Sequence, residues 1–180
     1  MRVIAGRYSG RRLTAPKGRT TRPTSERVRE ALYAMLGDIE GARVLDLFAG
    51  SGALGIEAVS RGAAGAVFVE RDRRAIAAIE ANIAALGLGE EQALIRREDV
   101  ASALRWASNR KETYDLILID PPYGRTPELE PLLAAALGGL LAPGARVVLE
   151  SDRRAPLQLG LAFEKERRYG DTIIAIYRHE

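Results

Sequence analysis

The distribution of apolar and polar residues predicts strands that alternate with helices. Short apolar runs without polar alternation are typical of strands buried on both faces of a parallel sheet. Four such runs lie at residues 43–47, 66–69, 93–95 and 114–119. Apolar residues at helical spacing follow the first two runs, over residues 53–61 and in the amphipathic stretch 76–86. This order of elements is that of an α/β chain.

The last third of the chain adds a helix, a strand and a closing hairpin. We expect these at residues 127–141, at 146–150, and at 161–168 paired with 172–178. Counted from Arg43, the chain then has seven strands, of which the last pair is antiparallel. The predicted fold class is α/β: a doubly wound, mostly parallel, Rossmann-like sheet of seven strands, with its ligand site above the switch point.

A carboxylate, two prolines and a tyrosine directly follow the strand at residues 114–119. They are Asp120, Pro121, Pro122 and Tyr123. Proline has no N–H and biases its predecessor towards extended geometry, so the carbonyl groups of Asp120 and Pro121 lack ladder partners. They lie at the carboxyl edge, where open α/β sheets bind ligands. The carboxylate and the carbonyl can accept hydrogen bonds from an NH2 group, and the tyrosine ring can stack on a base.

The Asp-Pro-Pro-Tyr tetrapeptide resembles the signature of the amino methyltransferases. These S-adenosylmethionine enzymes methylate exocyclic nitrogens of adenine, cytosine or guanine, and the tetrapeptide does not choose among the three bases. A strand end followed by a tight proline turn would give the same residues without this chemistry. A second motif upstream favours the chemical interpretation.

That second motif is a glycine-rich turn after the first predicted strand. Gly50, Gly52 and Gly55 satisfy the pattern G-x-G-x-x-G, which also occurs in dinucleotide sites. Asp46 favours another cofactor, because a carboxylate four residues before the first glycine is poorly matched to a pyrophosphate and suits the ammonium end of S-adenosylmethionine. Glu70 follows the next strand and can accept hydrogen bonds from both ribose hydroxyls with either cofactor.

A third candidate follows the short strand at residues 93–95. In methyltransferases of this architecture an acidic residue at this strand end accepts the adenine amino group, which indicates Asp99. The backbone N–H of Val100 can meet a ring nitrogen of the same adenine. Asp99 can equally serve as the N-cap of the next helix.

Composition excludes several kinds of chemistry. The 180 residues contain no cysteine, so disulfides, cysteine zinc sites, iron–sulfur clusters and thiol nucleophiles are excluded. The single histidine is His179, next to last, which argues against a catalytic imidazole. We see no signal peptide and no membrane-spanning run, and we expect one cytoplasmic domain that binds no metal.

Positive charge is concentrated at the N-terminus. Residues 1–30 carry nine basic and two acidic side chains, a net charge of +7, whereas residues 31–180 carry −4. Interleaved glycines and prolines predict a hairpin-like extension that leads to a helix from about Ser25 to Leu36. Such a patch fits a phosphate backbone, although a charge run can also be a solvated face. Beside a motif that stacks a base, we favour the RNA-docking interpretation.

Three segments carry a more specific resemblance. They are residues 22–33, residues 45–58 around the glycine turn, and residues 120–123. Together they resemble the bacterial small-subunit ribosomal RNA methyltransferases D, the RsmD type, over nearly the whole chain. The resemblance implies S-adenosylmethionine-dependent methylation of the N2 amine of one guanine in 16S ribosomal RNA, within an assembled or assembling subunit. Tyr33 stands where phenylalanine is more often expected, and the final third of the chain matches only in outline.

The motifs and the resemblance together give the expected site. The catalytic residues are Asp120, Pro121, Pro122 and Tyr123. The cofactor-binding residues are Asp46, Phe48, Gly50, Ser51, Gly52, Glu70, Asp99 and Val100. The RNA-binding residues are Arg7, Arg11, Arg12, Arg22, Thr24 and Arg27. We expect residues 1–24 to form the basic docking extension and residues 25–180 to form the methyltransferase domain of a monomer.

Methyl transfer from a sulfonium is consistent with the missing catalytic histidine, because the main task is to orient a poor nucleophile. Three alternatives stay open. Adenine N6 methylation on RNA or DNA fits the tetrapeptide equally well. A nicotinamide-dependent oxidoreductase fits the glycine pattern but leaves Asp46 and the tetrapeptide unexplained. A non-catalytic RNA-binding assembly factor could keep the same fold.

Overall fold

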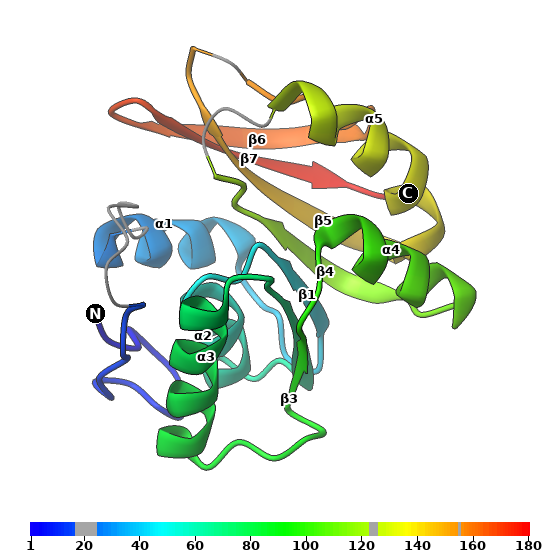
Figure 1. The fold of residues 1–180 in the computed structure, drawn as a ribbon. Helices are drawn as coiled ribbons and strands as arrows, with labels where there is room; N and C mark the ends of the chain where they lie inside the picture. The colour runs from blue at the N-terminus through cyan, green and yellow to red at the C-terminus, as the bar shows by residue number, and fades with distance from the viewer. Residues whose placement is uncertain (17–24, 123–125, 155) are drawn as a thin grey trace.

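Seven strands form one sheet in the order β3-β2-β1-β4-β5-β7-β6 (Figure 1). The computed structural model describes residues 1–16, 25–122, 126–154 and 156–180. The strands are β1 (Arg43–Leu47), β2 (Gly65–Val69), β3 (Ala93–Arg96), β4 (Tyr114–Ile119), β5 (Leu141–Asp152), β6 (Ala162–Tyr169) and β7 (Thr172–Arg178). The first five strands are parallel, and β7 is antiparallel to both β5 and β6. The predicted mostly parallel sheet is confirmed.

The strand order reverses between β1 and β4. From β1 the chain builds outward through β2 to β3, and it then returns to place β4 on the other side of β1. The connections after β1 and β4 therefore leave the sheet in different directions. A crevice at the carboxyl ends of the strands follows from this topology.

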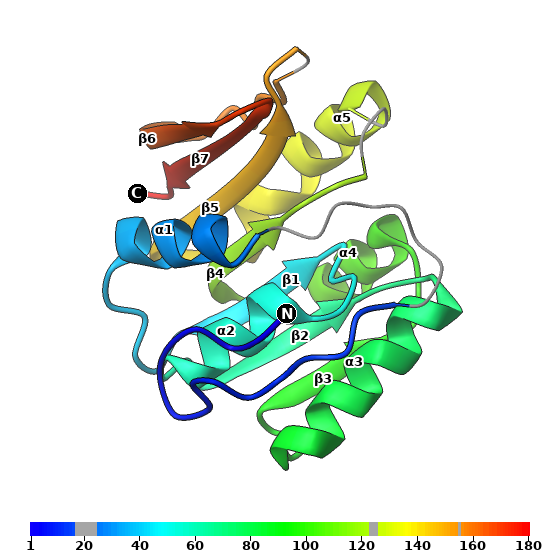
Figure 2. The same ribbon diagram turned by 90° about the vertical axis from the view of Figure 1, so that its left-hand side faces the viewer.

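Helices cover both faces of the sheet (Figure 2). They are α1 (Glu26–Leu36), α2 (Ala53–Ser60), α3 (Arg73–Leu86), α4 (Val100–Asn109) and α5 (Thr126–Ala136). Successive residues of β4 show the two faces: Leu116 and Leu118 belong to the core shared with α1, α2 and α3. Ile117 and Ile119 belong to the core shared with α4 and α5. The sheet is therefore doubly wound, as predicted.

The expected helix at residues 127–141 ends earlier than predicted. α5 stops at Ala136, and a short 3-10 helix, η1 (Leu137–Leu140), leads directly into β5. Gly138 and Gly139 lie within η1, and glycine disfavours the α-helix because it loses more backbone entropy than other residues. The strand expected at residues 146–150 therefore begins at residue 141 and extends to residue 152.

Residues 1–16, the described part of the hairpin-like extension, lie against α2 and α3 (Figure 2). The Val3 N–H donates to the Arg11 carbonyl, and the Leu13 N–H donates to the Met1 carbonyl, both at 2.9 Å. The side chains of Val3 and Leu13 are buried in the core shared with α1, α2 and α3. This part of the extension is therefore packed onto the sheet domain.

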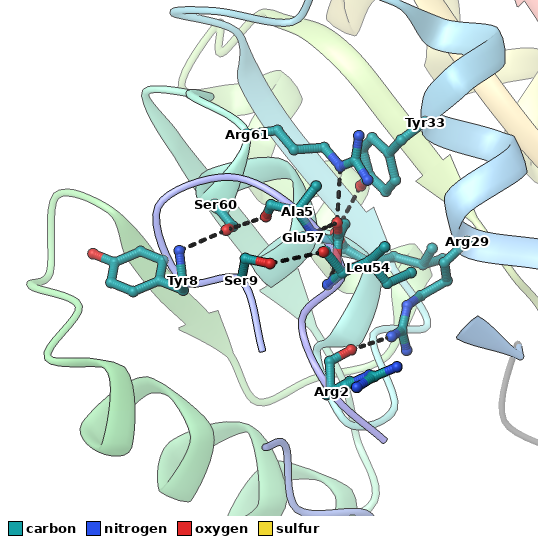
Figure 3. A network of polar contacts seen from close by, with 11 residues as sticks. Arg2, Ala5, Tyr8, Ser9, Arg29, Tyr33, Leu54, Glu57, Ser60 and Arg61 are labelled. Atoms are coloured by element: carbon teal, nitrogen blue, oxygen red, sulfur yellow. Dashed lines mark hydrogen bonds and ion pairs between the residues drawn. The ribbon is translucent and has the colours of Figure 1, made fainter. Parts of the chain in front are cut away.

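Polar side chains of α2 hold the extension in place (Figure 3). The fully buried Glu57 carboxylate accepts hydrogen bonds from the backbone N–H groups of Ile4 at 2.8 Å and Ala5 at 3.0 Å. Glu57 also forms an ion pair with Arg61, with 2.8 Å between Oε1 and Nε. Ser60 Oγ donates to the Ala5 carbonyl at 2.6 Å. Because Glu57 has both backbone donors and a cation as partners, its charge is compensated where it is buried.

Candidate functional site

A cavity of about 850 Å³ opens at the carboxyl edge of the sheet, beside the switch point between β1 and β4. Its volume falls within the range of pockets that hold small-molecule ligands. The strand ends and the start of α4 contribute residues 48–51, 69–72, 98–101, 120–122 and 150. The N-terminal extension, α1, α2 and α5 complete the lining.

The structure brings most of the sequence-predicted site residues together in this cavity. Those that line it are Phe48, Gly50, Ser51, Glu70, Asp99, Val100, Asp120, Pro121 and Pro122. Asp46 and Gly52 lie behind the lining, in β1 and at the N-cap of α2. Arg22, Thr24 and Tyr123 fall outside the described residues.

The turn between β1 and α2 has an unusual backbone. Gly52 is the N-cap of α2 and has a φ of +77°, in the left-handed region that glycine adopts without strain. Gly55 lies so close to β2 that an added Cβ would stand 2.4 Å from Cε1 of Phe68. Phe48 has a φ of +66°, which is strained for a residue with a side chain. The surrounding structure must hold this strain at the wall of the cavity.

Asp46 lies beneath the glycine turn, which differs from the expectation that it contacts a ligand. Its Oδ2 accepts a hydrogen bond from the Gly55 N–H at 2.9 Å, and the residue is 1% exposed. Burial is the main cause that raises the pKa of Asp46 to about 8; the Gly55 hydrogen bond acts against it, and the charges of Asp120 and Glu70 act with it. The side chain points to the face of β1 that α2 covers. Asp46 therefore positions the first turn of α2.

Glu70 is held by backbone donors from two segments of the cavity wall. Its Oε2 accepts a hydrogen bond from the Gly50 N–H, and its Oε1 accepts from the N–H groups of Arg71 and Asp72, each at 2.9 Å. The residue is 9% exposed and lines the cavity. One carboxylate thus joins the glycine turn to the segment after β2 and keeps lone pairs for a ligand.

Asp99 is the N-cap of α4, which is one of the two roles considered from the sequence. Its carboxylate accepts hydrogen bonds from the Ser102 N–H at 2.9 Å and from Ser102 Oγ at 3.1 Å. The backbone hydrogen bond from Ser102 is the main cause that lowers the pKa of Asp99. Asp99 is exposed and lines the cavity together with the buried Val100. A cap role and a ligand contact are therefore compatible.

Asp120, Pro121 and Pro122 line the cavity on the other side of β1 from Glu70, which follows β2. They directly follow β4 and are partly buried. Ile119, the last residue of β4, pairs with Leu149 of β5. The next residue of β5, Glu150, therefore lies beside Asp120 at the sheet edge.

Glu150 and Arg29 are among the charged residues of this cavity that sequence reasoning did not find. Glu150 could have been found, because it ends the apolar part of a predicted strand at the carboxyl edge of the sheet. Arg29 on α1 gave no signal, since an arginine in a basic segment is expected at the surface. It is fully buried, lines the cavity and donates from Nη2 to the Arg2 carbonyl. Burial is the main cause that lowers the pKa of Arg29, and the Glu57 charge opposes it.

The N-terminal extension borders the cavity through Met1, Ala15 and Pro16. Asn82 on α3 ties the extension to the glycine turn. Its Oδ1 accepts from the Thr14 N–H at 2.7 Å, and its Nδ2 donates to the carbonyls of Thr14 at 3.0 Å and Ser51 at 2.9 Å. A shift of the extension would therefore displace Asn82 and, through it, Ser51 at the cavity wall.

The described arginines of the predicted RNA surface are exposed. Arg7, Arg11 and Arg12 lie on the extension, and Arg27 lies on α1. Arg11 also donates to the Ala85 carbonyl at the end of α3, at 2.8 Å. Arg7, Arg11 and Arg12 are thus exposed on the same segment that borders the cavity.

The described ranges hold neither a candidate membrane span nor a candidate metal centre. No helix there is both long and apolar enough to span a membrane. No group of three or more His, Asp or Glu side chains there is arranged to hold a metal ion.

The fold and the cavity define an α/β protein of the methyltransferase class, and similar solved structures agree. The structure of yhhF from Escherichia coli matches with a TM-score of 0.83 and 35% identity, over 100% of this chain and 98% of that chain. The Thermus thermophilus 16S rRNA N2 methyltransferase RsmC, solved with AdoMet and guanosine, matches with a TM-score of 0.70 and 25% identity. That match covers 91% of this chain and 45% of that chain.

The chain belongs to the family described as Conserved hypothetical protein 95, whose model matches residues 1–178. It is 33% identical to the Ribosomal RNA small subunit methyltransferase D of Escherichia coli, over 100% of this chain and 90% of that protein. YlbH of Bacillus subtilis is 40% identical, over 99% of this chain and 98% of that protein. The resemblance to the RsmD type found in the sequence is confirmed.

Proposed function

We propose that this protein transfers a methyl group from S-adenosylmethionine to the exocyclic N2 amine of one guanine in small-subunit ribosomal RNA. The observation that carries the proposal is one cavity that joins Asp120, Pro121 and Pro122 to the glycine turn and Glu70. The name of the Escherichia coli relative refers to small-subunit ribosomal RNA, and RsmC was solved with guanosine and AdoMet. These names support the substrate and the cofactor.

The half of the cavity at the ends of β1, β2 and β3 fits S-adenosylmethionine. The Glu70 carboxylate is held at the cavity wall and can accept hydrogen bonds from ribose hydroxyls. Asp99 and Val100 lie at the start of α4. There the Asp99 carboxylate can accept a hydrogen bond from the adenine amino group, and the Val100 N–H can donate to a ring nitrogen. When bound, S-adenosylmethionine supplies a methyl group on a positively charged sulfur. Asp46 is covered and supports the glycine turn from beneath through the hydrogen bond that it accepts from the Gly55 N–H.

Asp120 and Pro121 hold the acceptor amine in this proposal. The Asp120 carboxylate and the Pro121 carbonyl accept the two N2 hydrogens, and this leaves the nitrogen lone pair directed at the methyl carbon. Such positioning can supply several kcal/mol of catalysis. The cationic amine formed is strongly acidic, so water or Asp120 can take its proton and no dedicated base is needed. Pro122 stiffens the segment, and Tyr123 stacks on the extruded base.

RNA docks on the basic extension, residues 1–24, in the same proposal. Arg7, Arg11, Arg12 and Arg27 are exposed, and Arg22 and Thr24 complete the expected set. Residues 1–16 also border the cavity, so RNA held there lies beside the site. The remaining part, residues 25–180, is the methyltransferase domain. We also propose that the protein is a monomer that acts on subunits in the cytoplasm.

Transfer of tritiated methyl groups tests the proposal. Purified protein is incubated with labelled S-adenosylmethionine and small ribosomal subunits from a strain that lacks the homologous enzyme, or with the protein-free RNA. We expect label in the small-subunit RNA, and stronger labelling of assembled subunits. Heat release on titration with S-adenosylmethionine and none with NAD excludes the oxidoreductase alternative. Cofactor binding without any transfer to either RNA substrate would contradict the enzymatic function.

A further inference from the structure

Glu150 and Asp120 lie side by side at the carboxyl edge of the sheet. β4 and β5 are parallel, and Ile119 pairs with Leu149. Neighbouring strands are spaced about 4.8 Å apart, so the residues that follow this pair are direct neighbours. Both line the same cavity. Glu150 is partly buried, so its side chain has little room to move away from the cavity but remains accessible to a ligand.

The two carboxylates also lie on the same face of the sheet. Leu118 and Val148 belong to the core shared with α1, α2 and α3, whereas Ile119 and Leu149 belong to the other core. Side chains alternate along a strand, so Glu150 returns to the face of Val148. Asp120 returns to the face of Leu118, because the proline after it favours extended geometry.

Glu150 belongs to the acceptor half of the cavity. The cofactor half is built at the ends of β1, β2 and β3, whereas β5 lies beyond β4 on the other side of β1. From Glu70 the order along the edge is therefore the glycine turn, Asp120 and then Glu150. A carboxylate at this place faces the base and not the adenosine of the cofactor.

Two adjacent carboxylates suit one particular edge of a purine. Guanine presents two neighbouring donors on this edge, the N2 amino group and the N1–H. Adenine and 2-aminopurine carry a lone pair at N1, which a carboxylate repels and cannot hydrogen-bond. Binding sites that leave a buried polar group unpaired with the wrong ligand discriminate strongly.

We propose that Glu150 selects guanine by accepting the N1–H, while Asp120 holds the N2 amine that is methylated. This inference rests on the proposed function and adds the residue that chooses the base. Glu150 is thus a specificity-determining residue of the acceptor half. The Asp-Pro-Pro-Tyr segment does not discriminate among bases, so in this proposal Glu150 supplies the discrimination.

The test compares the variant Glu150→Gln on two bases at the methylated position, once that position has been mapped. Small-subunit RNA is assembled by splinted ligation with either guanine or 2-aminopurine there; both bases carry the N2 amine, but only guanine has the N1–H. We expect kcat/KM on guanine to fall about 5- to 10-fold, because the glutamine oxygen can still accept the N1–H but carries no negative charge. The glutamine NH2 can donate to N1 of 2-aminopurine, so the guanine to 2-aminopurine ratio should fall at least about tenfold.

Asp152→Asn is the matched control, because it removes a carboxylate on the same strand outside the described cavity lining. Its ratio should equal that of the wild type. S-adenosylhomocysteine affinity should stay within about twofold in Glu150→Gln, which also shows that the variant is folded. An unchanged ratio, or a loss of cofactor affinity at constant ratio, would overturn the assignment. Failure of the wild type to methylate guanine at all would instead remove the proposed function.

Discussion

Glu70→Gln separates the bracing role of this carboxylate from its charge. The wild-type side chain accepts three backbone N–H groups with two oxygens, Gly50 on one and Arg71 with Asp72 on the other, each at 2.9 Å. Glutamine keeps one acceptor oxygen. If that oxygen stays with Arg71 and Asp72, the new NH2 group faces the Gly50 N–H, and two donors then oppose each other.

The cost follows from the lost acceptor. A partly buried donor left without a partner costs about 1–3 kcal/mol. The Gly50 turn should loosen, and the ribose should lose a charged acceptor, so we expect affinity for S-adenosylhomocysteine to fall about 10- to 100-fold. Without ligand, the thermal midpoint should fall by roughly 2–12 °C for a chain of this length.

Calorimetric titration and thermal melts measure both effects. Glu90→Gln, at an exposed position outside the described cavity lining, is the control and should match the wild type in affinity and melting temperature. An affinity of Glu70→Gln within twofold of the wild type would refute the reasoning. A lower melting temperature with unchanged affinity would leave Glu70 a purely structural residue.

Three further predictions concern other parts of the site. Asp120→Ala should keep cofactor affinity within a few-fold and lose most turnover, because this carboxylate faces the acceptor amine; normal turnover in the tritium assay would remove it from the mechanism. Changing Arg7, Arg11 and Arg12 together to Ala should weaken RNA binding and flatten the slope of log K against log salt by up to about 0.7–0.9 per lost phosphate contact, with cofactor binding unaffected; an unaltered slope would leave this surface merely solvated. Asp46 has a folded pKa of about 8, above its unfolded value, so its contribution to stability is present at low pH and is lost as pH rises to 8. The stability of Asp46→Asn relative to the wild type should therefore increase between pH 5 and 8, by up to about 1.4 kcal/mol per pH unit. If urea denaturation gives the two proteins the same dependence of stability on pH, the raised pKa of the buried Asp46 is contradicted.

The sequence predicted the bounds of an element well where its apolar pattern and the residues at its ends indicate the same limits. The run at residues 114–119 is apolar and ends at prolines, and β4 has the same bounds. Ser25 was expected to start a helix, and its side chain caps α1 by accepting from the Val28 N–H. The boundary between α5 and β5 was missed, because Gly138 and Gly139 weaken a helix without showing where it ends.

The sequence predicted which strand ends form the site, but it did not predict which of the charged side chains there are buried. The rule that ligands bind at the carboxyl edge placed Glu70 and Asp120 in one cavity. It could not show that α2 covers Asp46, because this depends on how closely Gly55 packs on Phe68. Nor could it show that Arg29 is buried, since its place depends on the extension that packs across α2 and α3.

Mass spectrometry of nucleosides tests the central claim most directly. Small-subunit RNA from a strain lacking the homologous enzyme is treated with purified protein and S-adenosylmethionine, digested to nucleosides and compared with untreated RNA. We expect one new modification, N2-methylguanosine, at close to one per subunit, and none with Asp120→Ala. New N6-methyladenosine in its place, or no new methylated nucleoside at all, would contradict guanine N2 methylation by this protein.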